Sequence, residues 1–367
     1  MPNNEKHVIL LIHNEITENT NMIGKQNTQL SILDGVLSGR KKRSRSDSLL
    51  KQINDFVDWQ KLSKICEKGY KDSTRGRPSL PLIVSVKCLF LQYLYDLSDP
   101  ALEDAIIDRL SFQRFLGVTF DEEIPDFSTI WRFRERLVKH DLYDPLFETV
   151  ESDLDNRGLI LRRGTIVDAT IVNSARRYHK EKNRNNTAPS SPVLPDSVEQ
   201  DNSASSRKDA QQDHDATVTK KGNKFYYGYK GHIGTDQGSD IIRRKQFTPA
   251  NIHDIQKREN LMSDDESAQF GDKGYFSDDK KRDLRKKGVY CGILDKGKRD
   301  HPLSTRQKQR NKQKSRVRCA VERPFAHMKK WYGYVRARYV NLKRNDLHFT
   351  FLCIIYNVRR GIALIER

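Results

Sequence analysis

The chain has 367 residues, of which 36% are hydrophobic and 32% are charged, and Lys and Arg outnumber Asp and Glu by 18. A chain of this length can form two or three domains with a buried core. So large a positive surplus favours a polyanion-binding protein over a uniformly solvated surface, because Lys and Arg that neutralise phosphates release condensed counterions. Nucleic acid is the polyanion that we expect.

Cysteine spacing and hydrophobicity argue against three classes of protein. The five cysteines are far apart and form no CxxC pair. This spacing argues against a zinc ribbon or a disulfide framework and favours a reducing cytosol. No apolar run approaches the length of a membrane span. We therefore expect a soluble protein of the cytoplasm that has no membrane partner.

The N-terminal part of the chain predicts an arm followed by helices. Residues 1–50 are polar and lack a hydrophobic period, which predicts a flexible basic arm. Residues 51–160 carry apolar side chains at three- and four-residue spacings, as helices do. Within SDPALEDAI, Ser98 or Asp99 can cap a helix whose first turn holds Pro100. The sequence therefore predicts an all-helical DNA-binding domain over 51–160.

A basic helix is predicted near the end of this domain. In FSTIWRFRERLVKH, Ile130, Phe133 and Leu137 share one face, whereas the basic side chains lie on others. A turn followed by a basic helix is typical of a helix-turn-helix-like DNA-reading element. An ordinary amphipathic helix with a solvated charged side fits equally well. The candidate DNA-binding residues here are Arg132, Arg136 and Lys139.

Residues 161–345 contain short β-branched and alternating runs as well as helical patterns, and they predict an α/β domain with a mixed sheet. GTIVDATIVNS, KFYYGYKGHIGTD, IIRRKQFTPA and VYCGILDKG are expected strands, and SDDKKRDLRKKG is an expected helix. Residues 179–222 are poor in apolar side chains and predict a low-complexity insert. Residues 346–367 predict an apolar C-terminal helix that packs on this domain.

Three carboxylates are candidates for chemistry. Asp168 lies in an otherwise apolar strand, where an unpaired carboxylate costs several kcal/mol. Asp272 follows a short strand between two glycines, although Asp-Lys-Gly is also an ordinary turn sequence. Glu322 is the single acid among fourteen Lys and Arg residues between Asp300 and Asp346. Taken one at a time, each acid also fits a structural role.

Taken together, the three acids indicate a metal site. Carboxylates on separate elements suit hard cations such as Mg²⁺ or Mn²⁺. Two such ions, about 3.5–4 Å apart, can activate an attacking oxygen and stabilise a leaving oxygen in phosphoryl transfer. In a helix, Arg318 and Lys329 lie on the same side as Glu322, and Lys330 follows. These bases are candidates to hold the scissile DNA phosphate and the strand beside it.

The chain resembles bacterial insertion-sequence transposases of the IS5 family, which are DDE transposases with an RNase H-like core. The resemblance covers most of the chain from about Met22 onward. It is carried by RGRPSLPLIVSVKCLFLQYLYDLSDPALEDAIIDRLSFQRFLG, DFSTIWRFRERL, GTIVDATIVNS, HDATVTKKGNKFYYGYKGHIGTD, TPANIHD, DKGYFS and RCAVERPFAHMKKWYG. The resemblance implies that Asp168, Asp272 and Glu322 are the catalytic, metal-binding acids.

The family's glutamate signature also has an Arg four residues before the Glu and a Lys seven residues after it, and Arg318 and Lys329 match both positions. A related signature often places Tyr where this chain has Ser315. Further family-like positions, without an assigned role, are His214, Asp215, Lys220, Lys230, His232 and Asp236.

The resemblance implies a transposase that binds the terminal inverted repeats of its insertion sequence and catalyses DNA cleavage and strand transfer with two Mg²⁺ or Mn²⁺ ions. The implied partners are transposon ends, target DNA and a second copy of the chain, in a homodimer or larger assembly at the bacterial nucleoid. Two alternatives stay open: a catalytically silent DNA-binding regulator, and a metal-dependent nuclease without strand transfer.

Overall fold

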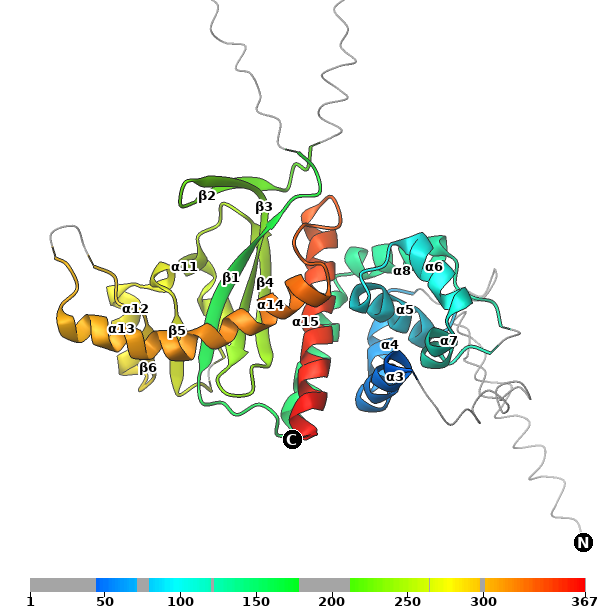
Figure 1. Ribbon diagram of the computed structural model, residues 1–367, viewed down its shortest axis with the longest axis horizontal. Helices are drawn as coiled ribbons and strands as arrows, with labels where there is room; N and C mark the ends of the chain where they lie inside the picture. Colours follow the sequence, from blue (N-terminus) through cyan, green and yellow to red (C-terminus); the bar gives the residue numbers. More distant parts are fainter. Residues whose placement is uncertain are drawn as a thin grey trace, which may run out of the picture.

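The computed structural model describes residues 44–70, 79–119, 122–177, 212–263, 265–297 and 301–366. They form an all-helical N-terminal region and a sheet with flanking helices, on either side of a long C-terminal helix (Figure 1). The predicted combination of a mixed α/β part with a helical N-terminal part is therefore confirmed.

The N-terminal region is built around one buried helix, α5. The helices are α3 Arg45–Phe56, α4 Trp59–Glu67, α5 Leu82–Leu94, α6 Asp99–Asp108, α7 Leu110–Leu116, α8 Phe127–Lys139 and α9 Tyr143–Asn156. Helix α5 is buried along nearly its whole length because α4, α6, α7, α8 and the C-terminal helix pack around it. The Ser98 hydroxyl caps α6 by accepting a hydrogen bond from the Ala101 N–H, as predicted.

The sheet has strand directions that match the RNase H-like core implied by the resemblance. Its strands are β1 Thr165–Asn173, β2 Thr217–Lys221, β3 Lys224–Asp236, β4 Ile242–Pro249, β5 Ala268–Gly271 and β6 Tyr290–Ile293. The main order is β4-β3-β1-β5-β6, and β2 pairs with the outer end of β3. Strand β3 is antiparallel to β1 and β4, whereas β1, β5 and β6 are parallel.

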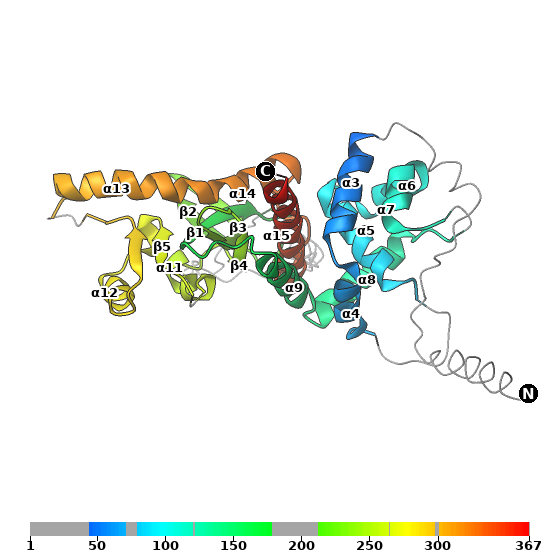
Figure 2. The same cartoon turned by 90° about the horizontal axis from the view of Figure 1, so that it is seen from below.

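Helices flank this sheet on both sides. They are α11 Asp254–Lys257, α12 Asp278–Lys286, α13 Thr305–Arg318, α14 Glu322–Trp331 and α15 Leu342–Ile365, with short 3-10 turns η1 Glu259–Leu261, η2 Lys273–Tyr275 and η3 Cys319–Val321. Figure 2 shows α13 and α14 as one nearly continuous rod along one face, with α12 on the opposite side. The predicted strands and the helix at SDDKKRDLRKKG are confirmed.

Two predicted segment boundaries are wrong. Helix α3 starts at Arg45, inside the predicted arm 1–50, because Leu50 packs into the core of the helical region. Strand β2 lies inside the predicted insert 179–222, because it forms a ladder of hydrogen bonds with β3. Both segments are polar in sequence, and contacts with distant residues order them.

Helix α15 contributes buried side chains to the hydrophobic core of both the helical region and the sheet. It begins at Leu342, earlier than the predicted boundary at residue 346, because the Asn341 side chain accepts a hydrogen bond from the Lys343 N–H. By length and composition alone, this helix is suited to cross a bilayer, but 72% of its apolar window is buried inside the protein. Its Phe349 ring packs on Phe247 of β4. Its Phe351 ring packs on Tyr93 of α5.

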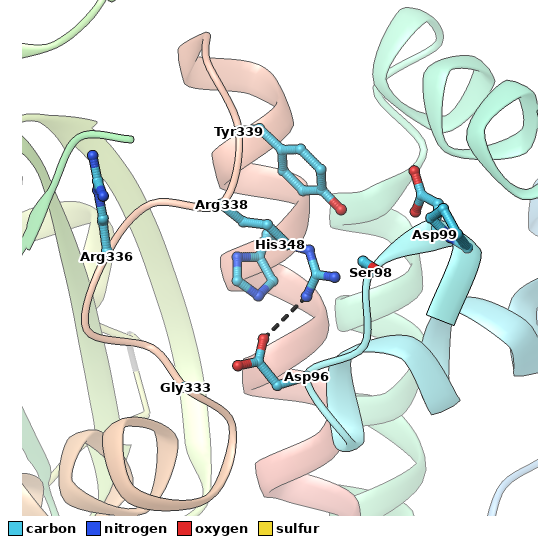
Figure 3. A pocket seen from close by; sticks show the side chains of 9 residues that line it. Asp96, Ser98, Asp99, Gly333, Arg336, Arg338, Tyr339 and His348 are labelled. Carbon is cyan, nitrogen blue, oxygen red and sulfur yellow. Dashed lines mark hydrogen bonds and ion pairs between the residues drawn. The ribbon is translucent and has the colours of Figure 1, made fainter. Parts of the chain in front are cut away.

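A polar hollow of about 590 Å³ lies where the helical region meets the segment between α14 and α15 (Figure 3). Arg338 from that segment forms a 3.1 Å ion pair with Asp96. Gly333, with a φ of +62°, approaches Asp96 so closely that a larger side chain would collide with its carboxylate. His348 of α15 lines the same hollow, is 3% exposed, and has no hydrogen-bond partner within the described residues.

We expect His348 to make the folded protein less stable in acid. Burial, helped by the charges of Arg338 and Arg134, lowers the pKa of His348 well below its ordinary value of 6.5. The folded protein therefore keeps the ring neutral as pH falls below 6.5, whereas the unfolded chain binds a proton. Because the unfolded state binds more protons, the free energy of unfolding falls by up to about 1.4 kcal/mol per pH unit from this residue.

Urea unfolding between about pH 7.5 and 5 measures this dependence. His348→Phe should flatten it, because Phe keeps an aromatic ring among Tyr93, Tyr334 and Tyr339 and cannot take up a proton. A His348→Phe variant that loses stability with acid as steeply as the natural protein would contradict the assignment.

Candidate active site

Asp168 lies in the middle of β1 and is the least solvated of the three candidate acids. Its side chain is 22% exposed. Burial is the main cause that raises the pKa of Asp168 to about 6. The charges of Asp272 and Glu322 also raise this pKa, whereas the Ala169 N–H and the Arg318 guanidinium lower it. The charges of Asp272 and Glu322 therefore reach Asp168 through space.

Asp272 lies beside Asp168 because of the register between two parallel strands. Thr165 of β1 pairs with Gln269 of β5, and Ile166 pairs with Phe270. The same register continued by two residues brings Asp168 and Asp272 to the same level of the sheet. Asp272 is exposed and caps η2, where its Oδ1 accepts a 2.7 Å hydrogen bond from the N–H of the next residue.

Glu322 comes from a helix and not from the sheet, because it is the first residue of α14. Helix α13 ends at Arg318, η3 follows, and Glu322 opens α14, whose first turn contains Pro324. Pro324 thus marks a new helix, since its missing N–H is not needed in a first turn. The Arg318 guanidinium donates a 2.7 Å hydrogen bond to Glu322 and lies 3.7 Å from the Asp168 carboxylate. It therefore bridges two of the candidate acids.

The donor set fits a hard divalent cation in its chemistry. The three side chains offer carboxylate oxygens, which Mg²⁺ and Mn²⁺ prefer. The Arg318 guanidinium supplies positive charge between Asp168 and Glu322, the place where a cation is favoured electrostatically. Within the described residues, no three His, Cys, Asp or Glu side chains are gathered closely enough to hold a metal ion. Side-chain rearrangement would be needed for the three carboxylates to hold one ion together.

Two of the predicted phosphate-binding bases lie on α14 beyond Glu322. Burial and then the charge of Lys221 lower the pKa of Lys329, and the charge of Asp168 opposes this lowering, so Lys329 lies within electrostatic reach of Asp168. Lys330 is exposed, and its ammonium lies 5.1 Å from the centre of the Trp331 ring. Lys329 therefore belongs to the neighbourhood of the acids.

The candidate bases on α8 are remote from these acids. Arg132, Arg136 and Lys139 are exposed, whereas Ile130, Phe133 and Leu137 are buried, as the helical spacing predicted. The Arg136 guanidinium lies 4.3 Å from the centre of the Tyr70 ring, and Arg132 and Arg136 line one hollow of the helical region. Figure 1 shows α8 and the sheet on opposite sides of α15. The structure thus gives two separate basic surfaces.

Several of the family-like positions without an assigned role have structural contacts. Asp236 is buried and accepts hydrogen bonds from the Leu161 and Arg162 N–H groups and from the Ser239 hydroxyl. Asp215 accepts a hydrogen bond from the N–H of Leu342 and so caps α15. These two acids hold loops and helix ends in place.

Two further positions form a polar cluster at the sheet. Lys230 forms a 3.1 Å ion pair with Asp254. His232 is buried, with its Nε2 3.0 Å from the Thr248 hydroxyl. Burial lowers the pKa of His232 to about 4, so this ring is neutral near pH 7.

Helix α13 is the functional element that the sequence analysis missed. The basic run from Thr305 to Arg318 has no clear apolar face, so hydrophobic periodicity does not reveal a helix. A capping box formed by Ser304 and Gln307 does mark its start. Lys314 fixes the helix to β6 by donating a 2.7 Å hydrogen bond to the Ile293 carbonyl. This anchor positions Arg318 over the acids.

An RNase H-like sheet with carboxylates at neighbouring strand positions and a basic helix across them is typical of enzymes that act on nucleic-acid phosphodiesters. Two family models match the chain. The Transposase DDE domain matches residues 160–358, which is more than half of the chain, and the Transposase domain (DUF772) matches residues 38–136. The chain therefore belongs to the DDE transposases.

One solved structure with a similar chain is a cryo-EM structure of piggyBac transposase in a synaptic complex with hairpin DNA. The two chains are 9% identical, the match covers 87% of this chain and 75% of that one, and the TM-score is 0.43.

Family membership confirms the expected enzyme class. A DDE transposase domain carries out metal-dependent DNA cleavage and strand transfer, so DNA is the substrate and a divalent metal ion is required. The comparisons give no support to the silent-regulator or nuclease alternatives.

Proposed function

We propose that Asp168, Asp272 and Glu322 are the three catalytic acids of this transposase and that together they bind two Mg²⁺ or Mn²⁺ ions. The register between β1 and β5 carries this proposal, because it brings Asp168 and Asp272 to one level of the sheet. The contacts of Arg318 with both Asp168 and Glu322 support the third acid.

Each basic side chain near the acids has a role in this proposal. When bound, divalent ions activate the attacking oxygen and stabilise the leaving oxygen. Arg318 and Lys329 neutralise and orient the scissile phosphate, and Lys330 holds the strand beside it. Water first cuts the phosphodiester at the transposon end, and the freed 3′-hydroxyl then attacks a target phosphodiester. Each step exchanges one P–O bond for another, so no side-chain nucleophile is needed.

Recognition of the transposon ends is assigned to α8. Arg132, Arg136 and Lys139 are exposed there, separate from the acids. We infer further that the protein is an IS5-family transposase of a bacterial insertion sequence that works at the nucleoid. Processing two ends together requires two active sites, so it acts as a homodimer or larger assembly on DNA.

Incubation with DNA that carries the terminal inverted repeats of its own element, a target plasmid and Mg²⁺ tests the proposed function. We expect cut ends and joined products, both lost when EDTA removes the metal. Cut ends without joined products would indicate a nuclease. A mobility shift without cutting would indicate a regulator, and either result would overturn the proposal.

Binding to end DNA should weaken steeply with salt. If the six candidate bases each neutralise one phosphate, the logarithm of the binding constant falls against the logarithm of salt concentration with a slope of about −5. Arg132→Gln should make this slope shallower by about 1. Lys343→Gln is the control, because Lys343 is exposed and pairs with Asp141. A slope near zero for the natural protein would mean that phosphate contacts do not dominate binding.

A further inference from the structure

The β2–β3 hairpin is an exposed feature for which the proposed reaction gives no role. Strand β2 pairs with the outer end of β3, and residues 220–225 at the tip are all exposed. The chain reverses through Gly222 and Asn223, and Gly222 has a φ of +60°, as the first position of a type II′ turn requires. The hairpin tip, residues 220–225, is therefore a defined projection from the sheet.

The hairpin tip carries one aromatic ring among three lysines. Phe225 is 70% exposed, more than any other large hydrophobic side chain in the described residues. The Lys220 ammonium lies 5.4 Å from the centre of this ring, and Lys221 and Lys224 flank the turn. No ion pair to a carboxylate is found for these lysines in the part of the chain that the structure describes. Such a surface is complementary to a partner that is both anionic and planar.

The hairpin extends from the part of the sheet that carries Asp168, because β3 pairs with β1 at Asp168 and then with β2 in the hairpin. Burial lowers the pKa of Lys329, the charge of Lys221 lowers it further, and the charge of Asp168 raises it. Lys329 is therefore within electrostatic reach of both the hairpin tip and the acids. Along the strands, Asn173 at the end of β1 pairs with Gly228 at the base of the hairpin, and the tip lies further along β3. That pair lies about 17 Å along β1 from Asp168.

We propose that the hairpin tip binds a single DNA strand a few nucleotides from the scissile phosphate. The three lysines contact its phosphates, and Phe225 stacks on one unpaired base. A positively charged track with an aromatic stacking surface is how proteins bind single strands of any sequence. A duplex fits less well because its bases are already stacked on one another. This inference rests on the proposed function, since it places the strand that leaves the acids on the hairpin.

Binding measurements with the full-length chain in EDTA test the inference. Anisotropy gives the affinity for a short single strand from the transposon end and for the corresponding duplex. Phe225→Ala should weaken single-strand binding about 5- to 150-fold and leave duplex binding unchanged. Phe225→Trp should restore single-strand binding. Tyr290→Ala, which removes a ring that is 57% exposed on β6, is the matched control and should change neither affinity.

The lysines are tested by salt dependence. Replacing Lys220, Lys221 and Lys224 with Gln should make the single-strand salt slope shallower by about 2. An unchanged slope would overturn their assignment as phosphate contacts.

Other results would overturn the role of Phe225. Single-strand affinity that Phe225→Ala leaves unchanged would exclude stacking, and equal losses for single strand and duplex would indicate a duplex contact. If Phe225→Ala changes the sedimentation coefficient of the protein in the absence of DNA, Phe225 contacts a second copy of the chain instead. If the natural protein binds duplex ends and the hairpin variants bind single strands as tightly as it does, the inference about the hairpin fails and the proposed function stands. If the natural protein binds no DNA, the proposed function itself fails.

Discussion

Asp272→Asn is expected to abolish DNA cleavage and strand transfer while binding to DNA ends survives. Asn keeps the size of the side chain and an oxygen that can accept the hydrogen bond from the Lys273 N–H. The substitution removes a negative charge that favours a divalent cation, and a bound cation contributes several kcal/mol to transition-state stabilisation. Since about 1.4 kcal/mol is tenfold in rate, cleavage should fall about a thousandfold.

Cleavage of labelled end DNA in Mg²⁺ and anisotropy with the same DNA are measured in parallel for this variant. Asp279→Asn is the matched control, because Asp279 is exposed on nearby α12 and pairs with Arg282. It removes the same charge from the same region. Retained cleavage in Asp272→Asn would remove Asp272 from the site, and equal losses in both variants would point to net charge instead.

Arg134→Met should destabilise the folded protein by about 3–5 kcal/mol, because it leaves a largely buried carboxylate without its cation. Arg134 is 2% exposed and donates two 2.8 Å hydrogen bonds to Asp99. Its guanidinium also lies 4.6 Å from the centre of the Tyr339 ring. The side chain thus joins α6 and α8 to the segment before α15.

Urea unfolding followed by circular dichroism measures the loss of stability in Arg134→Met. Arg132→Met is the matched control, since Arg132 is exposed on the same helix and its replacement should weaken DNA binding without changing the unfolding midpoint. The double variant Asp99→Asn with Arg134→Met should be more stable than Arg134→Met alone. If Arg134→Met unfolds at the natural midpoint, the buried pair does not hold the two regions together.

Much of the fold could be predicted because its determinants are local. Alternating and apolar runs identified β1, β3, β4 and β6, and the Ser98 cap with Pro100 identified the start of α6. The contact between Arg318 and Glu322 follows from their four-residue spacing and is confirmed. These features need only neighbouring residues, so one sequence is enough to infer them.

The rest depends on contacts between distant parts of the chain. Strand β2 is polar and exists because β3 pairs with it. The nearness of Asp168 to Asp272 depends on strand order and register, which no local pattern specifies. The reach of Arg318 to Asp168 requires α13 to dock on the sheet through Lys314. The sequence could therefore nominate the acids without specifying how the site is assembled.

The shared use of α15 has a consequence for how this transposase can acquire new end specificity. Phe351 of α15 packs on Tyr93 of α5, while Phe349 of the same helix packs on the sheet. The helical region therefore cannot be replaced without changing the core that it shares with the sheet. Grafting a foreign recognition region would uncover apolar side chains along α15 and favour aggregation. With α8 as the proposed recognition helix, new specificity is more accessible through single substitutions on its outer surface than through domain exchange, in laboratory redesign as in natural divergence.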